Sequence, residues 1–144
     1  MAYCDINRFH LIAGETIMAC QRIEYDIKII FSAMLQGRFN DNYALVKDKV
    51  LGQVLMDLER LDTSDGNPYF SPNDYRLLKE IREVRNWLVH KAYVDFMYND
   101  SGAKLEQAFN KAYNKLLDFN ARMQKLGNQV ENVRIDILKY YGRI

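Results

Sequence analysis

Apolar residues recur at steps of three and four along most of this chain, which is the spacing of one face of an α-helix. This pattern predicts helices over about residues 5–36, 43–61, 72–98 and 103–140. No segment alternates between apolar and polar residues for long enough to predict a β-strand. The first helix has the longest apolar stripe, formed by Phe9, Ala13, Cys20, Ile23, Ile27, Ile30, Phe31 and Met34.

Turn-forming residues separate these predicted helices. Gly37 and the polar residues that follow it end the first helix, and residues 62–68 form a loop rich in Asp, Ser, Gly and Pro. Ser71 is predicted to cap the third helix, with Pro72 in the first helical position. The run Asn-Asp-Ser-Gly at residues 99–102 ends that helix.

Composition agrees with a single globular domain that spans residues 1–144. Hydrophobic residues make up 49% of the chain and only two residues are prolines, which argues against disorder. Four helices with short connections predict an all-α fold, packed as an antiparallel four-helix bundle. No apolar run approaches the roughly 18 residues that a membrane span needs, so we expect a cytoplasmic protein without a membrane partner. Cys4 and Cys20 do not have the spacing of a disulfide framework or a metal site, and we expect reduced thiols.

Charge is distributed unevenly along the chain, although the net charge is only +1. Residues 1–100 contain 12 Lys and Arg against 15 Asp and Glu, a net charge of −3, whereas residues 101–144 contain 8 against 4, a net charge of +4. A basic last helix can follow a phosphate backbone, although a solvated helix face accounts for the same charges. The basic residues concerned are Lys111, Lys115, Arg122 and Lys125.

The main candidate for chemistry is the stretch Arg85-Asn86-Trp87-Leu88-Val89-His90 in the third predicted helix. An Arg-x4-His pattern that begins Arg-Asn, on a helix of a small all-helical chain, resembles the HEPN superfamily. The resemblance covers the helical fold in outline, and Gln21-x-x-Glu24 of the first helix agrees more weakly. Family members that keep the motif are typically metal-independent endoribonucleases, often toxins or defence proteins of prokaryotes. They typically dimerise, with the motif helices lining a shared groove.

The resemblance therefore implies a homodimer that cleaves RNA without a cofactor. His90 would take the proton from a ribose 2′-hydroxyl, and Arg85 would stabilise the charge that develops on the phosphate oxygens. Asn86 would orient the phosphate or His90. The family also implies a toxin or phage-defence effector held in check by an antitoxin, such as a nucleotidyltransferase-type partner.

Helical geometry places the motif residues on different sides of the third helix. At about 100° per residue, Arg85 falls inside the apolar sector and is expected to point inward, whereas His90 lies about 140° away and points outward. A buried guanidinium needs a partner. Glu24 falls inside the apolar sector of the first helix, so we expect a Glu24–Arg85 pair with Gln21 nearby.

Two aromatic residues of the same helix are candidates for contacts at the groove. Trp87 is predicted to lie on the outward side, which favours a dimer interface or an RNA-stacking platform. Tyr93 follows His90 by three residues. In some HEPN toxins the tyrosine follows the histidine by two residues and is modified by the partner, so the spacing here departs from that pattern. His10 has no further ligands at a suitable spacing, and no metal site is expected.

Two other functions remain open from the residues. The chain is alternatively a catalytically inactive helical dimerisation or regulatory module that keeps the motif for structural reasons. The second alternative is a helical nucleic-acid-binding regulator that uses the basic last helix.

Overall fold

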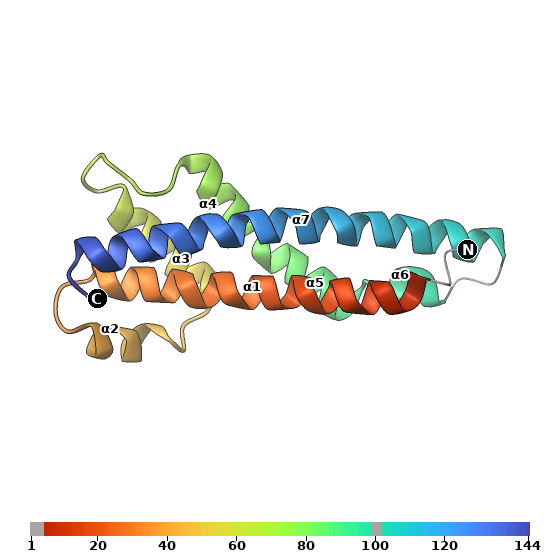
Figure 1. The fold of residues 1–144 in the computed structure, drawn as a ribbon, viewed down its shortest axis with the longest axis horizontal. Helices are drawn as coiled ribbons and strands as arrows, with labels where there is room; N and C mark the ends of the chain where they lie inside the picture. The colour runs from red at the N-terminus through yellow and green to blue at the C-terminus, as the bar shows by residue number, and fades with distance from the viewer. Residues whose placement is uncertain (1–4, 99–101) are drawn as a thin grey trace. The chain divides into compact units, whose positions relative to one another are not determined.

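The structure, a computed structural model, describes residues 5–98 and 102–144, and this part of the chain is all-helical with no β-strand. Figure 1 shows the helices in chain order. They are α1 (Ile6–Met34), α2 (Phe39–Val46), α3 (Leu51–Asp62), α4 (Pro72–Lys79), α5 (Ile81–His90), α6 (Val94–Met97) and α7 (Ala103–Tyr140).

The first and last predicted helices agree closely with α1 and α7, whereas the two middle ones are interrupted. The second is divided into α2 and α3 by residues 47–50, and the third is divided into α4, α5 and α6. Of the predicted break at residues 99–102, only Gly102 lies within the described residues, and its φ of 65° is left-handed. Cys4 also lies outside them, and Cys20 is fully buried.

The chain forms two compact units, and α1 and α7 contribute to both. The first unit contains the described residues up to Cys20 together with those between Ile81 and Lys125. The second contains the remainder, Gln21–Glu80 and Leu126–Ile144. A single domain over residues 1–144 stays a prediction.

In the first unit, α1 and α7 run in the same direction. The rings of Phe9 and Phe109 lie 5.7 Å apart. Two turns further along α1 and three turns further along α7, Thr16 Oγ1 donates a hydrogen bond to Asn120 Oδ1 at 3.0 Å. In both contacts, a residue further along α1 meets a residue further along α7. The two helices are therefore parallel.

The segment α5–α6 runs in the opposite direction to α7 in the same unit. Phe96 of α6 packs edge-on against Phe109 at 5.0 Å, and Trp87 of α5 packs edge-on against Phe119 at 5.5 Å. Edge-to-face aromatic pairs of this kind add about 0.5–1.5 kcal/mol beyond the area that they bury. The aromatic core therefore fixes how α5 is held against α7.

In the second unit, α1 and α7 are again parallel. Asp26 Oδ1 lies 3.0 Å from Arg134 Nη1, and near the chain terminus Arg143 donates hydrogen bonds to the carbonyls of Ala33, Leu35 and Gly37 at 2.8–3.3 Å. These carbonyls belong to the end of α1 and the turn after it, where helical partners are missing.

The antiparallel relation expected between the first and last helices is therefore wrong. In an up-and-down bundle with short loops they would run in opposite directions. Helix α3 is about 18 Å long against about 44 Å for α1, at 1.5 Å per residue. It packs on α4, where Lys79 Nζ lies 2.9 Å from Glu59 Oε1.

The start of α4 forms as the sequence predicts. Ser71 Oγ accepts a hydrogen bond from the Asp74 N–H at 3.0 Å, and Asp74 Oδ2 accepts one from the Ser71 N–H at 2.8 Å. This reciprocal capping box satisfies two backbone donors, and Pro72 occupies the first helical position. Burial acts to raise the pKa of the Asp74 carboxyl, but hydrogen bonds with Ser71 and Gln129 together lower it below its usual value.

Candidate functional site

The candidate site lies on α5, in the first unit. Asn86 and His90 are exposed, as expected, but Arg85 is exposed as well. The expectation that Arg85 points into the core is therefore wrong. At 100° per residue, the exposed residues of α5 cover an arc of about 160°, which begins at Arg85 and ends at Glu83. Between these two lie Val89, Arg82, Asn86 and His90. Val89 is 68% exposed.

The error comes from treating residues 72–98 as one helix. The α-helix is interrupted at Glu80 and again at residues 91–93, so residues 72–98 are not one continuous helix. Taken by itself, α5 has an apolar sector about 50° away from the one expected for an uninterrupted helix. This sector consists of Ile81, Val84, Trp87 and Leu88.

A wide turn closes α5 directly after the motif. The carbonyl of Trp87 accepts hydrogen bonds from the N–H of Lys91 at 2.9 Å and from the N–H of Ala92 at 2.8 Å. The second bond spans five residues, which is the pattern of a π-turn, a common way for a helix to end. His90 is thus the last residue of α5, beside an irregular turn that leads to Tyr93.

Trp87 holds α5 in place from the buried side. Its side chain is only 4% exposed, so the expectation of an outward Trp87 at a groove is wrong. The indole Nε1–H donates a hydrogen bond to Asp95 Oδ2 at 2.9 Å. The ring packs edge-on against Phe119, and Lys115 Nζ lies 4.9 Å from its centroid. Trp87 therefore fixes the orientation from which the motif side chains emerge.

Tyr93 pairs with a residue from α1 that the sequence did not single out. The Tyr93 hydroxyl lies 2.7 Å from His10 Nδ1, and the two rings stack at 5.3 Å and 27°. Phe9 packs edge-on against Tyr93 from the core side, at 5.2 Å. Burial raises the pKa of the Tyr93 hydroxyl, which keeps it neutral. Because 83 residues separate His10 from Tyr93, no local pattern could predict this pair.

Glu24 and Gln21 belong to the second unit, whereas Arg85 belongs to the first. Glu24 is half-buried and lies 3.6 Å from Lys28 Nζ, one turn further along α1. Gln21 is exposed. A Glu24–Arg85 pair would join the two units and stays a prediction.

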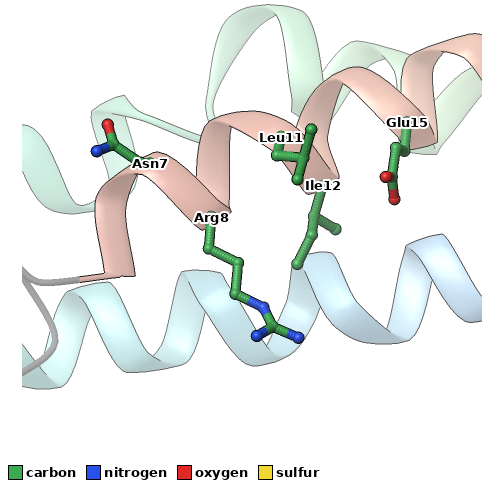
Figure 2. A pocket seen from close by; sticks show the side chains of 5 residues that line it. All are labelled: Asn7, Arg8, Leu11, Ile12 and Glu15. Carbon is green, nitrogen blue, oxygen red and sulfur yellow. The ribbon is translucent and has the colours of Figure 1, made fainter.

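An open hollow lies on the first turns of α1 (Figure 2). It is lined by Asn7, Arg8, Leu11, Ile12 and Glu15, with Arg8 and Ile12 projecting from the same side of the helix. None of the predicted site residues lines this hollow. Its few polar groups do not converge as they do in most ligand pockets.

The basic residues of α7 are partly engaged with aromatic rings. Arg122 lies over the ring of Phe119, at 5.1 Å from its centroid, and pairs with Asp118 at 3.0 Å. Lys111 and Lys125 are exposed. Among residues 5–98 and 102–144, no three His, Cys, Asp or Glu side chains gather in a way that could hold a metal ion. Within the same residues, no helix combines the length and the apolar composition needed to cross a bilayer.

Comparison of the chain with protein-family models, with curated proteins and with solved structures gives no match. The resemblance to the HEPN superfamily therefore depends on the motif residues of α5 and on the all-helical fold.

Proposed function

We propose that this chain is a HEPN-like helical domain that acts as a metal-independent endoribonuclease. The observation that supports the proposal most directly is the exposure of Arg85, Asn86 and His90 on a single helix. A cation, an amide and an imidazole that all reach solvent from one short helix are available to a phosphate and to the ribose beside it.

The chemistry follows from the properties of these side chains. His90 takes the proton of a ribose 2′-hydroxyl, since the unperturbed pKa of histidine, about 6.5, suits proton transfer near neutral pH. The 2′-oxygen attacks the adjacent phosphorus atom, and the bond to the 5′-oxygen breaks. Arg85 donates hydrogen bonds to the phosphate oxygens as negative charge builds on them. The products are a 2′,3′-cyclic phosphate and a 5′-hydroxyl.

The proposed biological setting is a homodimer that acts as a toxin or phage-defence effector. The setting implies an antitoxin, with a nucleotidyltransferase-type partner as one candidate. This part of the proposal is drawn from the resemblance.

The decisive experiment incubates purified protein with RNA in the presence of EDTA. We expect the wild-type protein to produce fragments with 2′,3′-cyclic phosphate ends, and His90→Ala and Arg85→Ala to lose at least about 100-fold in rate, because general acid–base and charge-stabilising groups each contribute that much. Arg38→Ala is the matched control, because Arg38 is an exposed arginine that lies before α2, outside the motif helix. Equal cleavage by wild type and His90→Ala would contradict the proposal.

RNA binding and dimer formation, measured on the same proteins, separate the two alternative functions: a nucleic-acid-binding regulator and a catalytically inactive module. Exposure of Lys111 and Lys125 on α7 favours RNA binding by this helix. A nucleic-acid-binding regulator would bind RNA in a salt-dependent way that survives His90→Ala and weakens in Lys111→Gln/Lys125→Gln. A catalytically inactive module would neither cleave nor bind RNA, yet would still form the dimer in solution.

A further inference from the structure

His10 of α1 and Tyr93, which follows His90, form a pair that the proposed reaction does not yet use. The two side chains meet through the hydroxyl and Nδ1, 2.7 Å apart, with their rings stacked. His10 is exposed and Tyr93 is half-buried. A surface histidine held by both a hydrogen bond and a stacked ring has far fewer orientations than a free one, which is the arrangement that acid–base catalysis requires.

The position of this pair relates it to His90. Tyr93 lies three residues beyond His90, across the turn in which the Trp87 carbonyl accepts from Lys91 and Ala92, so the Cα atoms of His90 and Tyr93 are at most about 11 Å apart. Phe9, in the core, fixes the Tyr93 ring on its other side. The first unit therefore brings a second imidazole, from a distant part of the sequence, to the side of the turn where α5 ends.

The hydrogen bond also determines which nitrogen of His10 can exchange a proton. Burial raises the pKa of the Tyr93 hydroxyl, so this group stays neutral and its oxygen can accept the Nδ1–H of the imidazole. Whichever of the two groups donates, Nδ1 is engaged by Tyr93, and Nε2 is the nitrogen that remains to face a substrate. A histidine whose second nitrogen is held by a fixed partner is the usual form of a catalytic acid or base.

We propose that His10 is the general acid of this site and that Tyr93 is its positioning residue. The inference rests on the proposed ribonuclease function and assigns the group that completes it. His90 receives the proton of the 2′-hydroxyl as the 2′-oxygen bonds to phosphorus. The phosphorus–5′-oxygen bond breaks, and the 5′-oxygen takes the proton from Nε2 of His10. One proton is taken up and one is released, so His90 ends protonated and His10 neutral.

The experiment compares two substrates that differ in a single atom. One is a short RNA that the wild-type protein cleaves, and the other carries sulfur in place of the 5′-bridging oxygen at the cleaved linkage. A thiolate leaves without being protonated, because a thiol, with a pKa near 8.5, is far more acidic than an alcohol. A variant that lacks the general acid is therefore impaired on the first substrate and rescued on the second.

We expect His10→Gln to lower kcat/KM by about 100-fold on the oxygen substrate and by less than about threefold on the sulfur substrate. His90→Ala should be impaired on both. Tyr93→Phe keeps the ring that stacks on His10 but removes the hydroxyl, so it should shift the alkaline limb of the pH–rate profile and lower kcat more than it changes KM. Leu11→Ala, which removes an exposed side chain next to His10, is the control and should match the wild type on both substrates.

Two results would overturn the role of His10. Equal losses on both substrates mean that His10 acts through folding or binding, and an undiminished rate on the oxygen substrate means that it has no role. Both results leave the ribonuclease function standing, provided that His90→Ala is inactive. If folded wild-type protein cleaves neither substrate, the proposed function itself fails and the role of His10 fails with it.

Discussion

Trp87 and Asp95 are joined across the turn that ends α5, with the indole Nε1–H donating to Asp95 Oδ2 at 2.9 Å. Trp87 belongs to α5 and Asp95 to α6, so this hydrogen bond connects two helical segments that the π-turn separates. The bond fixes the direction of the chain directly after His90. It therefore stabilises both the motif helix and the position of Tyr93.

Removal of the acceptor should weaken the first unit. Asp95→Ala leaves the indole N–H without its partner in a partly buried position, and we expect a loss of about 1–2 kcal/mol in the free energy of unfolding. Asp95→Asn keeps an oxygen that can accept from the indole and should cost less than half as much. Urea unfolding followed by tryptophan fluorescence measures both losses, since Trp87 is the only tryptophan. Equal stability of Asp95→Ala and wild type would contradict this role.

The apolar pattern of the sequence was sufficient to predict the all-helical fold, the extents of α1 and α7 and the cap at Ser71. It did not predict the breaks at Glu80 and at residues 91–93, because no glycine or proline marks them. Within α5 alone the buried residues are Ile81, Val84, Trp87 and Leu88, which leaves Arg85 exposed and Trp87 buried.

Only those residues of the candidate site that are close in sequence were predictable. Arg85, Asn86 and His90 lie within six residues, so a motif could identify them. The pair of His10 and Tyr93 depends on how α1 packs against the segment after α5, and contacts between distant residues leave no trace in a single sequence. Only the three-dimensional structure shows that the imidazole of His10 contacts Tyr93.

Two glycines inside long helices should respond differently to alanine. Nothing lies within 4 Å of the position that a Cβ atom of Gly14 would take, so Gly14→Ala should stabilise the protein by about 0.5–1 kcal/mol through helix propensity. A Cβ atom at Gly127 would overlap the guanidinium of Arg22, which donates a hydrogen bond to Asn128 at 3.4 Å. Gly127→Ala should therefore gain less than Gly14→Ala, or destabilise the protein.

A double-mutant cycle tests this explanation for Gly127. In an Arg22→Ala background the overlap is gone, and Gly127→Ala should recover the full gain of about 0.5–1 kcal/mol. Thermal unfolding of the four proteins provides the measurement. If Gly127→Ala has the same effect in both backgrounds, Arg22 is not the reason that glycine is needed at this position.

Asp62 is a buried carboxylate that organises the loop between α3 and α4. It is 3% exposed and accepts hydrogen bonds from the N–H groups of Tyr69 and Phe70, at 2.9 and 3.1 Å, and from the Tyr75 hydroxyl at 2.6 Å. Burial, followed by the hydrogen bond to Asp62, raises the pKa of Tyr75 far above its usual value. This phenol therefore remains a donor over the whole range in which the protein is folded.

Loss of the carboxylate should cost more than loss of the phenol. Tyr75→Phe removes one hydrogen bond to a charged group, and we expect a loss of about 1.5–3 kcal/mol. Asp62→Ala leaves several buried donors unsatisfied, and the loss should exceed that of Tyr75→Phe by at least about 1 kcal/mol. Tyr69→Phe alters only a partly exposed hydroxyl and serves as the control. A smaller loss for Asp62→Ala than for Tyr75→Phe in urea unfolding would sink this account.

Asp26 and Arg134 form an ion pair in the second unit that should make stability depend on pH. The Asp26 side chain is 3% exposed, and its Oδ1 lies 3.0 Å from Arg134 Nη1. Burial raises the pKa of the Asp26 carboxyl above 3.8, even though the charge and the hydrogen bond of Arg134, with a smaller contribution from Arg22, act in the opposite direction. The negative charge of Glu131 adds to the rise.

The sign of the effect follows from proton linkage. Between pH 3.8 and the raised pKa, the native protein binds the Asp26 proton more tightly than the unfolded chain does, so ionisation of this group lowers the free energy of unfolding as pH rises. Asp26→Asn has the same shape and cannot titrate. The stability of the wild-type protein relative to Asp26→Asn should therefore fall with rising pH from about pH 4 and become constant above the raised pKa. Urea unfolding at intervals between pH 3.5 and 7 measures this difference, with the exposed Asp136→Asn as the control. If the stability of the wild type relative to Asp26→Asn rises with pH instead, the attraction between Asp26 and Arg134 outweighs the cost of burying the carboxylate. The ionised pair then stabilises the second unit.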